Sequence, residues 1–108
     1  MENTSPFLAM KRAEGLIKAL LRNVDIDHLT QTEKKSIASL RRLAVDARLD
    51  IRDYELSETR EDQLKCAVVA KRRLIKLRET ILAVGSSFGP ADVAQLTAQL
   101  EQIEDWVR

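Results

Sequence analysis

The sequence predicts an all-α protein: an up-down four-helix bundle in which a long central helical hairpin is flanked by two shorter helices. Two observations carry this prediction. Apolar residues make up 44% of the chain but aromatic residues only 4%, so the core is expected to consist of Leu, Ile, Val and Ala, which suit helix packing better than a β-sandwich. Apolar residues also recur at spacings of three and four in four separate segments, which is the period of an amphipathic helix.

Length and composition predict one cooperative domain over residues 1–108. Charged residues make up 32% of the chain, with three Gly and two Pro, a balance typical of a globular helical protein. Cys66 is the only cysteine, which excludes an internal disulfide and fits a reducing compartment. No apolar run approaches the roughly 18 residues of a membrane helix, and the N-terminus does not read as a signal peptide. We therefore expect a cytoplasmic protein with no membrane partner.

The first helix is expected over about residues 6–24. Ser5 is suited to the N-cap and Pro6 to the first helical position, where its missing N–H costs nothing. One stripe at spacings of three and four contains Met10, Ala13, Ile17, Leu20 and Val24. The segment DIDHL then breaks the period, so a short loop is expected to follow.

The second helix is expected over residues 31–55, because Thr30 and Glu33 form a capping box at its start. Its inward seam comprises Ile37, Leu40, Ala44, Ala47, Ile51 and Tyr54. Ser57 followed by Glu58 and Glu61 indicates a cap with acids in the first turn of a new helix. We therefore expect a tight turn at Ser57. One uninterrupted helix of about fifty residues is the alternative, because neither Gly nor Pro marks the turn.

The third helix is expected over residues 58–84, with a wide apolar face. Its seam comprises Ala67, Ala70, Leu74, Leu77, Ile81 and Val84, and one flank is widened by Leu64, Val68, Ile75 and Leu82. Such a wide face predicts contact with at least two neighbouring helices. The segment GSSFGP then ends the helix, with Gly85 suited to its C-terminal end and Pro90 to the next start.

The fourth helix is expected over residues 91–106, with apolar residues Val93, Leu96, Leu100, Ile103 and Val107. Short connections make consecutive helices antiparallel neighbours, which gives the up-down bundle. At about 1.5 Å per residue, the hairpin helices would be roughly 38 Å long and the outer helices roughly 25 Å. The hairpin is therefore expected to overhang, and a homodimer that covers the overhang is left open.

Charge is distributed unevenly, although the formal net charge is only +1. The segment KCAVVAKRRLIKLR, residues 65–78, contains six positive charges and no negative one. An antiparallel hairpin that turns near Ser57 sets Arg41 and Arg42 level with Arg72 and Arg73. The candidate binding residues are therefore these cations together with an apolar anchor near the C-terminus: Arg41, Arg42, Arg72, Arg73, Lys76 and Trp106.

Three interpretations of these cations are open. They could be solvated helix flanks whose long side chains cover neighbouring apolar atoms. They could bind an acidic protein partner, or an acidic patch of another copy of this chain, through charge complementarity. They could also bind DNA or RNA, since the charge suffices for several phosphate contacts. No aromatic residue interleaves with the cations to stack bases, however, and no zinc-finger, helix-turn-helix or RNA-binding signature is present.

Few residues indicate chemistry. Asp25, Asp27 and His28 combine oxygen and imidazole ligands, but they match no EF-hand or zinc pattern. Cys66 has no base near it in the sequence, and GSSFGP lacks the Lys-Ser/Thr ending of a P-loop. We therefore expect neither a metal nor a cofactor.

A minor alternative is a small helical enzyme that holds a dianionic substrate between cationic side chains. The cations that would do so lie on adjacent expected helices: Arg41, Arg48, Arg72 and Arg78. Glu55 and Gln63 lie nearby in the sequence. They match no catalytic pattern. We expect instead a non-enzymatic adaptor or regulatory protein that acts by protein–protein interaction, with DNA or RNA binding by the basic face as the alternative.

Overall fold

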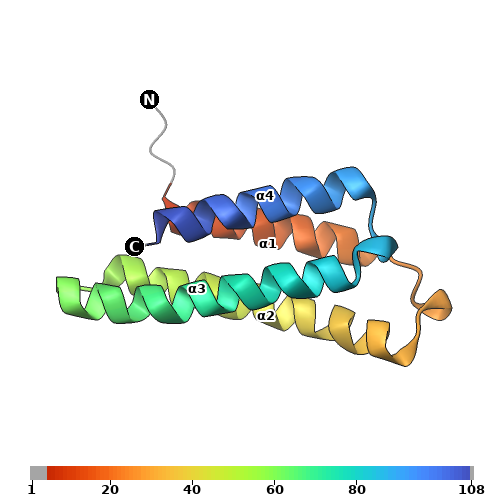
Figure 1. Ribbon diagram of the computed structural model, residues 1–108, viewed down its shortest axis with the longest axis horizontal. Coiled ribbons are helices and arrows are strands. Elements are labelled where there is room, and N and C mark those ends of the chain that lie inside the picture. The colour runs from red at the N-terminus through yellow and green to blue at the C-terminus, as the bar shows by residue number, and fades with distance from the viewer. Residues whose placement is uncertain (1–4, 108) are drawn as a thin grey trace.

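The computed structural model describes residues 5–107, so residues 1–4 and 108 of the expected domain lie outside it. The described range contains four α-helices and no strand, which confirms the all-α prediction (Figure 1). The helices are α1 (Pro6–Arg22), α2 (Gln31–Leu56), α3 (Arg60–Ala83) and α4 (Pro90–Trp106), and the 3-10 turns are η1 (Ile26–His28) and η2 (Gly85–Ser87). Each helix end lies within two residues of its expected position.

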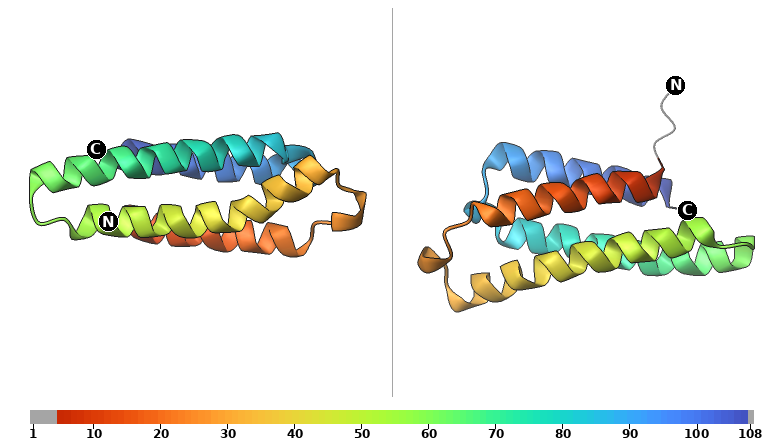
Figure 2. Two further views of the ribbon diagram at one scale, coloured as in Figure 1. Left: turned by 90° about the horizontal axis from the view of Figure 1, so that it is seen from below. Right: turned by 180° about the vertical axis from the view of Figure 1, so that it is seen from behind.

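The helices form a ring in two layers. In Figures 1 and 2, α1 and α4 make one layer, α2 and α3 make the other, and the chain reverses direction at each connection. Each helix contacts the next along the chain, and α1 contacts α4 to close the ring. The α2–α3 hairpin extends past α1 and α4 at its turn (Figure 1), so the expected overhang is present.

Side-chain caps explain where the first two helices begin. The Ser5 hydroxyl accepts a hydrogen bond from the Leu8 N–H at 3.1 Å. The Thr30 hydroxyl accepts from the Glu33 N–H, and the Glu33 carboxylate accepts from the Thr30 N–H, both at 3.1 Å. The capping box predicted at Thr30 is therefore formed, and it satisfies two donors that the first helical turn would leave unpaired.

The turn between α2 and α3 is present, so the alternative of one uninterrupted helix is wrong. The predicted cap is also wrong, because the residue that caps α3 is Thr59, whose hydroxyl accepts from the Asp62 N–H at 3.1 Å. Ser57 lies two residues too early to reach that N–H. Its hydroxyl instead donates to the Asp53 carbonyl at 2.8 Å and so serves the end of α2.

The core lies along the axis of the ring. All six predicted seam residues of α3 are buried, while the other predicted stripes include four residues that are only partly buried: Leu20, Val24, Ile37 and Val93. Sequence reasoning missed Leu43 and Phe88, which are both buried. The periodicity of each helix therefore predicts the centre of its buried face but not the edges of that face.

One expectation about α3 is wrong. The flank that was expected to pack against a neighbour, Leu64, Val68, Ile75 and Leu82, is 47%, 51%, 40% and 56% exposed. α3 does contact two helices, α2 and α4, but these two neighbours cover only its seam. A line of large apolar side chains on α3 therefore faces solvent. Among the described helices, none is long and apolar enough to cross a membrane.

Candidate functional site

Acid–arginine pairs join each pair of consecutive helices, and we call these three contacts the interhelical clasps. Between α1 and α2, Arg48 Nε donates to Glu14 Oε2 at 2.6 Å. Between α2 and α3, Arg73 Nε donates to Asp50 Oδ2 at 3.0 Å. The clasp between α3 and α4 joins Arg78 Nε to Glu104 Oε2 at 3.1 Å. Each clasp therefore joins two helices that are neighbours in the bundle.

Glu14 is the centre of the first clasp and is almost buried, with 6% of its surface exposed. Its other carboxylate oxygen lies 3.0 Å from the Lys18 ammonium. Burial on its own would raise the pKa of the Glu14 carboxyl, but hydrogen bonds and charge from Lys18 and Arg48 outweigh burial and lower it. Sequence reasoning missed Glu14, because nothing local shows that Arg48 lies beside it.

The second clasp changes the interpretation of the basic residues that the sequence places along the α2–α3 hairpin. Arg73 was expected to lie level with Arg41 and Arg42, but it reaches two acids of α2, Asp50 at 3.0 Å and Asp46 at 3.7 Å. The third clasp likewise uses Arg78, whose pKa is raised by its hydrogen bond to Glu104. Both arginines are therefore neutralised within the protein and contribute less charge to a partner than the sequence suggests.

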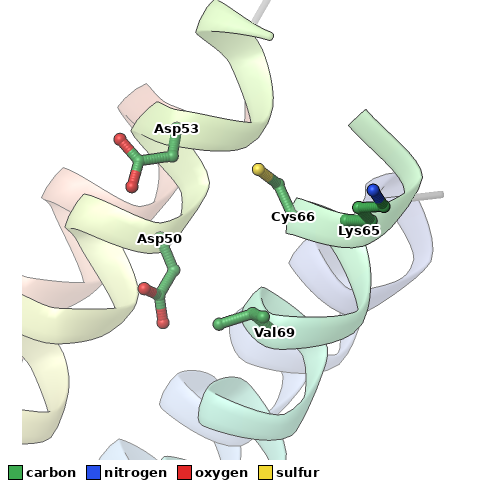
Figure 3. A pocket seen from close by; sticks show the side chains of 5 residues that line it. All are labelled: Asp50, Asp53, Lys65, Cys66 and Val69. Atoms are coloured by element: carbon green, nitrogen blue, oxygen red, sulfur yellow. The ribbon is translucent and has the colours of Figure 1, made fainter. Parts of the chain in front are cut away.

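A groove between α2 and α3 begins near their turn (Figure 3). It encloses about 200 Å³, and its lining consists of Asp50, Asp53, Lys65, Cys66 and Val69. In Figure 3 the Cys66 side chain points toward α2, while the Lys65 ammonium points away. The thiol lies 3.5 Å from the Ser57 hydroxyl, a neighbour too weakly basic to remove its proton. The Ser57 hydroxyl therefore does not activate the Cys66 thiol as a nucleophile.

A second depression adjoins the first at Val69 and brings three predicted site residues together. Its lining consists of Val69, Arg72, Arg73 and Lys76, and it holds about 240 Å³. Arg41 and Arg42 are exposed on α2 but do not line it. Trp106 is 38% exposed and ends α4, in the other layer. The six predicted residues therefore do not form one site.

The surface that stands out is the outer face of α3. We call the exposed line of Leu64, Val68, Ile75 and Leu82 the α3 stripe, because spacings of four and seven place these residues along one side of a helix. Three cations flank it, namely Lys71, Arg72 and Lys76, and none of them forms an ion pair with a carboxylate in the described range. Sequence reasoning found the apolar residues but assigned them to the core.

The acidic loop before α2 shows ordinary capping rather than a metal centre. His28 Nε2 lies 3.1 Å from Asp25 Oδ2, and both side chains are well exposed. Asp25 also accepts the Asp27 N–H. Glu33 lines a shallow depression together with Asp25 and His28, and it accepts the Thr30 N–H. Across residues 5–107, no cluster of three or more His, Cys, Asp or Glu is placed to hold a metal ion.

No protein-family model, curated protein or solved structure matches the chain. Its function is therefore inferred from its residues and their geometry. Arg48, Arg73 and Arg78 pair with acids in the interhelical clasps, whereas the exposed side chains of the α3 stripe are apolar and have cations beside them.

Proposed function

We propose that this protein is a small non-enzymatic helical adaptor or regulator that acts by binding another protein. The observation that supports the proposal is the α3 stripe, whose side chains are 40% to 56% exposed on a helix with a fully buried seam. Apolar surface gains about 25 cal/mol for each Å² removed from water. Exposed apolar side chains rimmed by polar residues are typical of an interaction site, and Lys71, Arg72 and Glu79 rim the apolar side chains of the stripe.

DNA or RNA binding is the alternative function. Arg41, Arg42, Arg72 and Lys76 are exposed cations on α2 and α3, and could contact phosphates. Of the six positive charges in residues 65–78, however, Lys65, Arg73 and Arg78 already pair with acids of this chain. Phosphate contacts also give no role to the α3 stripe. A protein partner uses both the cations and the apolar side chains, so we favour it.

Photo-crosslinking tests the proposal. Benzoylphenylalanine at position 79, an exposed residue between Ile75 and Leu82, would lie on the α3 stripe, and the same group at exposed Gln102 of α4 is the matched control. In a lysate of the source cells, we expect protein adducts at position 79 that survive nuclease treatment and are weak at position 102. The absence of adducts specific to position 79 would contradict the proposal.

A salt titration separates the two functions. About six phosphate contacts should weaken nucleic-acid binding on the order of a thousandfold between about 50 and 200 mM salt. We expect the purified protein to be free of nucleic acid by its absorbance ratio, and its light-scattering mass to be the same at both salt concentrations. Nucleic acid that is bound at low salt and released at high salt would favour the alternative.

A further inference from the structure

We infer that the partner presents an amphipathic helix with acidic flanks, and that this helix lies along the α3 stripe. The inference rests on the proposed function, because it names the class of protein that the stripe would bind. Three observations support it: the shape of the stripe, the unpaired cations beside it and the positions of those cations along α3.

The shape of the stripe fits one helix. Leu64 and Leu82 are five turns apart, which corresponds to about 27 Å along α3. Between them Val68 and Ile75 follow a single line, and exposed Val69 lies to one side of it, beside Arg72 and Lys76. A partner helix with its own apolar residues at spacings of three and four would match this line over its whole length. An added β-strand would need a sheet edge, and residues 5–107 contain no strand.

Charge specifies the flanks of the partner helix. Lys71 and Arg72 lie between Val68 and Ile75, and Lys76 follows directly, so three cations without an ion pair border the middle of the stripe. A docked helix would remove part of their water, which is unfavourable unless they gain carboxylate partners. Glu79 is exposed near the Leu82 end. Carboxylates of the partner should therefore gather at the level of residues 71–76.

A second copy of this chain is a poorer occupant of the stripe. If two stripes packed antiparallel about a two-fold axis, Lys71 and Arg72 of both copies would meet near the centre. If they packed parallel, each cation would lie opposite its own counterpart. Both arrangements bring like charges together, which is destabilising in an interface. A homodimer that packs one stripe on the other is therefore not the expected use of this surface.

Two synthetic peptides test the inference on the full-length protein. Each is a fluorescein-labelled helix of 21 residues with Leu at spacings of three and four, and the flanking positions are Glu in one peptide and Lys in the other. Fluorescence anisotropy should show that the Glu peptide binds at least about tenfold more tightly than the Lys peptide at about 50 mM salt. Amide NMR shifts on adding the Glu peptide should fall within residues 64–82.

Two variants locate the contact. Val68→Asp with Ile75→Asp should abolish binding of the Glu peptide, while circular dichroism reports whether the fold is kept. Arg72→Glu with Lys76→Glu should reverse the preference in favour of the Lys peptide. The matched control, Arg41→Glu with Arg42→Glu, makes the same charge change on exposed α2 positions and should keep the preference for Glu.

Equal affinity for the two peptides, NMR shifts outside residues 64–82, or no saturable binding below about 1 mM would overturn the inference. If one of these peptide outcomes occurred but protein adducts still formed at position 79, the inference of an acidic partner helix would be wrong and the proposed function would stand. Absence of both adducts and peptide binding would remove the proposed function as well.

Discussion

At the scale of single residues, Glu14 shows how this fold accommodates a charge in its interior. A buried carboxylate is unfavourable unless it is paired and hydrogen-bonded. Glu14 has a cation on each oxygen, Arg48 at 2.6 Å and Lys18 at 3.0 Å. Glu14 therefore makes a specific contact between α1 and α2. An apolar side chain at this position would pack against α2 without requiring a particular residue opposite it.

The lowered pKa of Glu14 predicts a loss of stability in acid. Its pKa in the folded protein lies below the ordinary value of 4.5, so the ionised carboxylate stabilises the fold above that value and this contribution is lost as the pH falls through the folded pKa. Glu14→Gln should lower the free energy of unfolding by about 1–2 kcal/mol at pH 7. In urea denaturation, its difference from the wild type should shrink as the pH falls from about 5 toward 3.

Glu58→Gln is the control for this experiment, because Glu58 is exposed in the α2–α3 turn and loses the same charge. Its difference from the wild type should be small at every pH. If the Glu14→Gln difference stayed constant across the acid range, the carboxylate would not be stabilised by its two cations.

At the scale of elements, the α2–α3 turn depends on a cap that sequence reasoning assigned to the wrong residue. Thr59→Ala removes the hydroxyl that accepts the Asp62 N–H, and should lower the free energy of unfolding by about 1 kcal/mol. Ser57→Ala is the matched control and should change it by less than about 0.5 kcal/mol. Chemical denaturation compares the two variants, and equal losses would show that both hydroxyls define the turn.

The seam of α3 could be predicted in full from the sequence because a helix repeats its buried positions with a fixed period. The exposure of Leu64 and Val68 could not be predicted, because the period of a helix does not show how much of its apolar face the neighbouring helices cover. Lys76 and Arg72 were predicted as site residues on charge alone, and the structure places both beside Val69. Their apolar companions could be assigned to the surface only once α2 and α4 were in place.

The clasps could not be predicted for a different reason. Their partners are 34, 23 and 26 residues apart in the chain, so each depends on the register between two helices. The sequence set Arg73 level with Arg41 and Arg42, but it did not show that the Arg73 side chain would reach Asp50. The sequence gives the number of cations on the hairpin, but only the contacts in the structure show which of them are paired with acids.

At the scale of the whole molecule, the helices differ in how well their ends are stabilised, and the ends of α4 receive little stabilisation from side chains. Its N-cap, Gly89, provides no side-chain hydrogen bond, and its last turn contains no basic residue. Glu104 and Asp105 lie near its C-terminus, where the helix dipole disfavours anions. Arg78 on α3 offsets part of this charge through its contacts with Glu104 and Glu101.

We therefore expect α4 to open before the other helices. In native-state hydrogen exchange, amides of α4 should exchange faster than those of α2, and Arg78→Gln should accelerate exchange in α4 selectively. Lys76→Gln is the matched control, because Lys76 is exposed on the same helix, and it should leave the α4 rates unchanged. Uniform acceleration of all four helices by Arg78→Gln would show that the bundle opens as a single unit.

The clasps also select the handedness of the bundle. An apolar seam is nearly symmetric about the centre line of its helix, so it packs similarly whether the ring turns left or right. The clasp residues are asymmetric, because Arg48 lies on the flank of α2 that faces α1, while Asp50 lies on the flank that faces α3. In the mirror topology these flanks would be exchanged, so Arg48 would face α3, Asp50 would face α1, and both clasps of α2 would be lost. The loss of these contacts would therefore disfavour a bundle of the opposite hand.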